Sequence, residues 1–135
     1  MIALMLFRGN EEKKERERVT REEIDRLASL TPEKLALEVM LALASDGVKE
    51  GPARGVRMLT IIKHLVESAG GSFGASARSL FSPTQEALQR LEHANLVLGS
   101  ASTGAGIDST RWRITTSGEQ ALADGDVATK VAGSD

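Results

Sequence analysis

The sequence predicts a mainly α-helical fold with a small β-hairpin, and three observations carry this prediction. Apolar residues recur at helical spacing in residues 33–45, 56–68 and 83–94. A short apolar run at 96–98 reads as a strand, and the alternating residues 111–114 read as a second. Between them, residues 99–109 are rich in glycine and serine, as expected of a hairpin tip.

The composition favours one domain and excludes several kinds of site. The chain has 135 residues, of which 41% are hydrophobic, which is enough for a core. It has no cysteine, so disulfides and thiolate metal sites are excluded. Only 3% of the residues are aromatic, which argues against a surface that stacks single-stranded bases. We expect no cofactor and no metal.

The first seven residues, MIALMLF, are apolar but too short to cross a bilayer. They also lack the leading positive charge and the cleavage site of a signal peptide. They could form an edge strand, an arm that docks on a partner subunit, or a locally buried terminus. We therefore expect no membrane association and a cytoplasmic protein.

The net charge of −2 is unevenly distributed. Residues 52–113 carry 7 basic and 4 acidic side chains, whereas both flanking segments are acidic on balance. Only the middle of the chain therefore has the sign that a phosphate backbone would attract.

Residues 1–18 are predicted to be an N-terminal arm that ends in a mixed charge run, EEKKERER, typical of a solvated helical face. Thr20 with Glu23 forms a capping box that predicts a helix start, and Thr31 with Pro32 predicts another. Residues 33–45 are apolar nearly all round, which is typical of a central core helix or of a dimer seam. Residues 19–50 are thus predicted to be helices that could mediate dimerisation.

Residues 51–124 are predicted to form the main domain. A loop at 47–55 precedes the helix that runs to Ser68, and a short helix is expected at 75–81. Ser82 and Pro83 then open a further helix, with Gln85 at the capping-box position. Its inward face is expected to hold Thr84, Ala87, Leu88 and Leu91, and its outer face Ser82, Gln85, Glu86, Gln89, Arg90 and His93.

The second strand of the hairpin should point Arg111 and Arg113 to one face, and Trp112 and Ile114 to the other. Thr116 with Glu119 is expected to cap a final helix at 117–123. The small, polar residues 125–135 are predicted to be a disordered tail.

Two stretches carry a resemblance to known regulators. ARSLFSPTQEALQRLEHANLV resembles the short helix, turn and recognition helix of the MarR, ArsR and PadR families, with Asn95 where those families place glycine. WRITTSGEQAL resembles their closing strand and helix start, with Trp112 at a common aromatic position. The resemblance covers residues 55–123 and implies a winged helix-turn-helix with an N-terminal helical extension. The chain lacks the Tyr-Pro of PadR proteins and most of the C-terminal flank of MarR proteins, so dimerisation is expected through residues 20–46.

The resemblance implies a homodimeric transcriptional regulator that binds double-stranded DNA sequence-specifically. A helix N-terminus suits phosphate, glutamine can pair with adenine, and strand arginines can approach the backbone or minor groove. The candidate DNA-binding residues are Ser82, Thr84, Gln85, Gln89, Arg90, Arg111 and Arg113. The alternative is a winged-helix module that binds another protein and no DNA.

An enzyme is not expected. His64 and His93 have no cysteine near them and no second histidine at i+4, so neither predicts a metal site. Residues 99–106 have the glycine spacing of a phosphate loop but lack the lysine that should follow.

Overall fold

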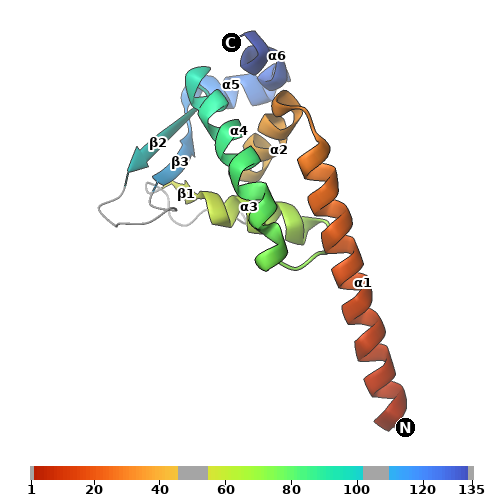
Figure 1. Cartoon of the computed structure of the whole chain (residues 1–135). Coiled ribbons are helices and arrows are strands. Elements are labelled where there is room, and N and C mark those ends of the chain that lie inside the picture. The colour runs from red at the N-terminus through yellow and green to blue at the C-terminus, as the bar shows by residue number, and fades with distance from the viewer. Residues whose placement is uncertain (1, 46–54, 102–109, 134–135) are drawn as a thin grey trace.

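The computed structural model describes residues 2–45, 55–101 and 110–133 (Figure 1). It is mainly helical with one small antiparallel sheet, which confirms the predicted fold class at this coarse level. The elements in chain order are α1 (Ile2–Ser29), α2 (Pro32–Ala44), β1 (Val56–Arg57), α3 (Met58–Ser68), the 3-10 helix η2 (Ala75–Leu80), α4 (Phe81–His93), β2 (Val97–Ala101), β3 (Thr110–Ile114), α5 (Thr116–Asp124) and α6 (Val127–Gly133). The sheet order is β1-β3-β2.

Helix α2 is the centre of the core. It begins as predicted, with Pro32 in its first turn and the Thr31 hydroxyl accepting a hydrogen bond from the Lys34 amide at 3.3 Å. Its buried residues pack against α3, α4 and α6, so most of its apolar circumference is covered within one protomer. Of the two expected roles, central core helix is therefore confirmed. Leu41, 54% exposed, is the large apolar residue of α2 that stays open to solvent.

Helix α1 is continuous from Ile2 to Ser29, so the edge strand, one of the three alternatives for the first seven residues, does not form at residues 2–7. The expected helix start at Thr20 is wrong. The Thr20 hydroxyl donates to the Arg16 carbonyl at 2.7 Å, a bond made inside a helix rather than at its cap. Residues 11–18 are exposed, whereas Ile24 and Leu27 are buried. The N-terminal half of α1 projects from the body (Figure 1), and no break in the helix separates residues 2–18 from those that follow.

Strand β1 was predicted as the start of a helix. Val56 instead pairs with Trp112 on β3, and Arg57 pairs with Arg111. Gly55, at φ +75°, precedes it, and a Cβ there would lie 2.9 Å from the Trp112 carbonyl oxygen. This close backbone approach requires glycine at position 55, where the chain comes alongside β3. Residues 47–54 of the predicted loop at 47–55, and residues 102–109 of the predicted hairpin tip at 99–109, lie outside the described residues.

The C-terminal segment also differs from its prediction. Residues 127–133 form α6 rather than a disordered tail. Val127 and Val131 are four residues apart, so both lie on one face of the helix, and they are buried where α6 packs on α2. This apolar pair is enough to dock a short helix. In the described part of the chain, no helix is long and apolar enough to cross a membrane.

Candidate nucleic-acid interface

Helix α4 has the two faces that its sequence predicts. Ala87, Leu88 and Leu91 are fully buried and hold the helix against α2 and α3. Gln85 and Gln89 are exposed, one turn apart on the opposite side. The polar face is thus available to a partner, while the apolar face fixes the orientation of the helix.

The start of α4 differs from its prediction. The helix begins at Phe81 and follows η2 without an intervening turn, so Ser82 lies inside the first turn instead of capping it. No side chain caps this end, and the predicted capping box with Gln85 does not form. Ser82 remains exposed, and its hydroxyl can still meet a ligand on the outer face.

Thr84 is removed from the candidate site by its burial. It is 0% exposed, so its hydroxyl cannot reach a phosphate. Its Oγ1 also has no hydrogen-bond partner among the described residues, which is unusual for a buried polar atom. Thr84 therefore belongs to the core, and its expected DNA contact is wrong.

Arg90 is partly engaged by an acidic neighbour. Its Nη2 lies 3.3 Å from Oε1 of Glu86, one turn earlier on the same helix, and its side chain is 26% exposed. Glu86 is exposed and brings negative charge to the polar face of α4. Glu86 occupies the Nε and Nη2 donors of Arg90, and its negative charge opposes the approach of a phosphate to the same guanidinium.

The sheet presents arginine side chains on one face. Arg111 and Arg113 alternate with Trp112, which is buried, so the predicted alternation of β3 is confirmed for these three residues. Arg57 pairs directly with Arg111 across the β1–β3 ladder and is exposed. We refer to Arg57, Arg111 and Arg113 as the arginine row. Arg57 was not predicted to belong to this face, because a two-residue strand has too few positions to show alternation.

Two side-chain hydrogen bonds hold the end of α4 and the turn after it against the sheet. Glu92, in the last turn of α4, accepts the Gly99 amide of β2 at 3.0 Å. Thr115, just after β3, donates its hydroxyl to the Asn95 carbonyl at 2.6 Å. Asn95 has φ 64°, a left-handed conformation that asparagine tolerates, as its place at the glycine position predicted. The sheet is thereby held at a fixed angle to the polar face of α4 (Figure 1).

The same turn also starts α5. Thr115 accepts the Gly118 amide at 3.0 Å, so it is the N-cap, one residue before the predicted Thr116. Only glycine fits at position 118, because a Cβ there would lie 2.1 Å from the Leu96 carbonyl oxygen. One threonine thus connects the end of α4, the end of β3 and the start of α5.

Comparisons with protein-family models, curated proteins and solved structures found no match to this chain. In the part of the chain that the structure describes, no cluster of three or more histidine, aspartate or glutamate residues could hold a metal ion.

Proposed function

We propose that this chain is a winged helix-turn-helix protein that binds double-stranded DNA as a homodimer and regulates transcription. The observation that carries the proposal is the order of elements from α2 onward: α2, β1, α3, α4, β2 and β3, with the short helix η2 leading into α4. Strand β1 pairs with β3, so the sheet order is β1-β3-β2. In this arrangement α3 and α4 would be the helix-turn-helix, and β2 with β3 would be the wing.

In the proposed complex α4 is the recognition helix. Its second and third turns carry Gln85 and Gln89 on the exposed face, where the amide groups can donate to and accept from adenine in the major groove. Ser82 lies beside them and suits a phosphate contact. Glu86 opposes phosphate and would restrict how close the backbone comes, so base contacts must supply part of the binding energy.

The arginine row is the proposed contact with the sugar–phosphate backbone. Three guanidinium groups on one face of a small sheet form a positive surface in a chain whose net charge is −2. Phosphate contacts position a protein without reading bases. Their contribution should therefore be similar for all DNA sequences.

A protein-binding function is the second candidate, and one residue favours it. Leu98 is 42% exposed on β2 and pairs with Arg113, so an apolar side chain interrupts the positive surface of the sheet. An apolar contact would lose little affinity as salt rises, whereas phosphate contacts release counterions and weaken steeply.

The test is the affinity for a random duplex at two salt concentrations, for wild type and for the double variant Arg111→Ala with Arg113→Ala. We expect the variant to bind every sequence more weakly, and its salt slope to fall by about 0.9 for each lost phosphate contact. A matched control replaces two exposed cations elsewhere, Lys34→Ala with Lys130→Ala. An unchanged slope in the double variant would remove Arg111 and Arg113 from the backbone contact, and a wild type without affinity for DNA would favour protein binding.

A further inference from the structure

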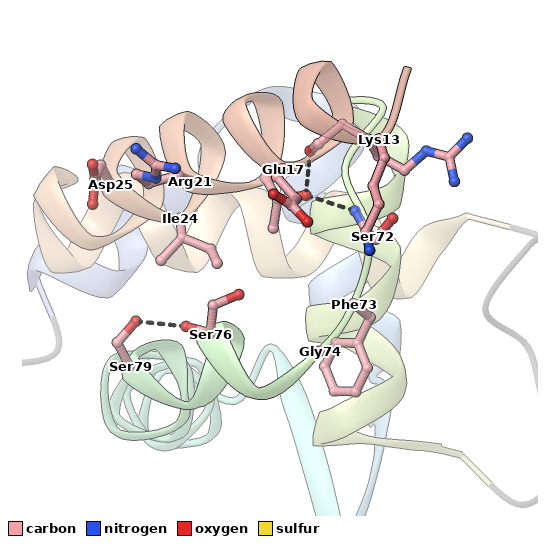
Figure 2. Close-up of a pocket in the computed structure, with 12 residues that line it drawn as sticks. Lys13, Glu17, Arg21, Ile24, Asp25, Ser72, Phe73, Gly74, Ser76 and Ser79 are labelled. Carbon is pink, nitrogen blue, oxygen red and sulfur yellow. Dashed lines mark hydrogen bonds between the residues drawn. The ribbon is translucent and has the colours of Figure 1, made fainter. Parts of the chain in front are cut away.

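A groove runs between α1 and the segment that leads into α4 (Figure 2). Its volume is about 760 Å³, and Ile24 and Phe73 supply its apolar surface. Phe73 is 37% exposed, a large apolar side chain left open to solvent beside the groove. The Thr20 hydroxyl accepts the Ser72 amide at 2.8 Å and holds α1 against the segment at this point.

The α1 side of the groove carries an alternating charge ladder. Lys13, Glu17, Arg21 and Asp25 follow one another at intervals of four residues, and all four line the groove. Within the described residues, none of these four side chains forms an ion pair or hydrogen bond. Arg18 and Arg26 of the same helix, by contrast, pair with Glu15 and Glu23. In the ladder each charge is therefore flanked only by the opposite charges one turn away on the same helix, at distances too long for an ion pair or a hydrogen bond.

If two copies of the ladder lie side by side in antiparallel directions, every positive charge of one copy lies opposite a negative charge of the other. A two-fold axis on the ladder side of α1, halfway between positions 17 and 21, would place Glu17 of one copy opposite Arg21 of a second copy, and Arg21 opposite Glu17. Positions 17 and 21 differ by only about 40° around a helix, so both can face the middle of such a seam. A contact of this kind is isologous, because the same patch serves both copies.

We propose that two copies of this chain associate through antiparallel α1 helices, each seated at the groove of the other. Residues 11–18 support this occupant, because they are all exposed on a helix that projects from the body. A short helical segment is marginally stable alone in water, and a neighbouring helix would stabilise it. The groove also borders η2, which continues into α4, so the interface would fix the separation of the two α4 helices.

This inference rests on the homodimer of the proposed function and not on its binding to DNA. Sedimentation velocity without DNA gives the dimer dissociation constant for wild type, Glu17→Arg and Arg21→Glu. Each change makes two symmetry-related pairs repulsive, and we expect the dissociation constant to rise about tenfold or more. Glu22→Arg makes the same charge change on a side of α1 that does not line the groove, about 120° around the helix from the ladder, and should leave the constant unchanged.

Complementation makes the test specific. An equimolar mixture of Glu17→Arg and Arg21→Glu should form heterodimers, since arginine then faces glutamate at both pairs. One chain that carries both changes should dimerise like wild type. A monomeric wild type at tens of micromolar, single variants that dimerise normally, or a mixture that stays monomeric would overturn the interface. If these interface results hold while wild type lacks affinity for DNA, only the proposed function fails.

Discussion

At the scale of single residues, Thr84 shows how a polar side chain can sit in a core without a partner. A buried hydroxyl that makes no hydrogen bond loses its contacts with water and regains nothing. We predict that Thr84→Val, which replaces the hydroxyl by a methyl group, raises the free energy of unfolding by about 1 kcal/mol. Urea denaturation measures the change. A loss of stability would mean that the hydroxyl is satisfied in solution, for example by a buried water molecule.

Thr115 is the opposite case, a hydroxyl that makes two contacts. It donates to the Asn95 carbonyl and accepts the Gly118 amide. Thr115→Val should therefore lower the free energy of unfolding by about 1–2 kcal/mol, the usual range for a lost helix cap. Thr116→Val is the matched control, because Thr116 is exposed and should change stability by less than about 0.5 kcal/mol. Equal effects at both positions would contradict the assignment of the cap.

At the scale of elements, the two faces of α4 should separate stability from recognition. Leu88 is fully buried, and Leu88→Ala should lower the free energy of unfolding by roughly 2–5 kcal/mol. Gln89 is exposed, and Gln89→Ala should change stability by less than about 0.5 kcal/mol. If Gln89 reads a base, its loss should narrow the gap between cognate and random DNA by about 1–3 kcal/mol.

A binding selection on a randomised duplex pool tests this reading of α4. Wild type and Gln89→Ala should enrich motifs that differ at one position. The same motif from both proteins would remove Gln89 from base recognition. A pool without enrichment for either protein would favour the protein-binding candidate.

Elements that depend on local chemistry were predictable, and those that depend on distant contacts were not. The Thr31–Pro32 start of α2 and the buried face of α4 follow from capping and from helical spacing. Strand β1 needs β3, more than fifty residues away, and its two residues show no periodicity of their own. The capping box at Thr20 failed because helix already precedes it, which turns the hydroxyl toward Arg16.

The candidate site shows the same difference between features that depend on local sequence and features that depend on distant contacts. The exposure of Gln85 and Gln89 and the common face of Arg111 and Arg113 were predictable, because both follow from the period of one element. Arg57 joins that face only through strand pairing. The link between Thr115 and Asn95 depends on two turns meeting in space, which no local pattern records.

At the scale of the whole molecule, α2 contacts elements from the middle of the chain and from both of its ends. Helix α4 covers one part of its surface and α6 another, while Arg26 of α1 donates to Glu38 of α2 at 3.1 Å. Hydrogen bonding to Glu23 raises the pKa of Arg26, which favours the charged guanidinium in these contacts. The core is therefore complete only when the C-terminal helix is present.

This arrangement predicts that the C-terminal segment is part of the cooperative fold. Deleting residues 126–135 exposes the surface of α2 that Val127 and Val131 cover. Because burying one valine side chain contributes about 1.5–3 kcal/mol, we expect the free energy of unfolding to fall by about 2–4 kcal/mol after some relaxation of the site. Deleting only 134–135 is the control and should leave the urea midpoint unchanged. The experiment is done at one protein concentration, since a dimer would make stability depend on it. Equal midpoints for the two truncations would mean that α6 contributes nothing to the core, and that the tail behaves in solution as its polar composition suggests.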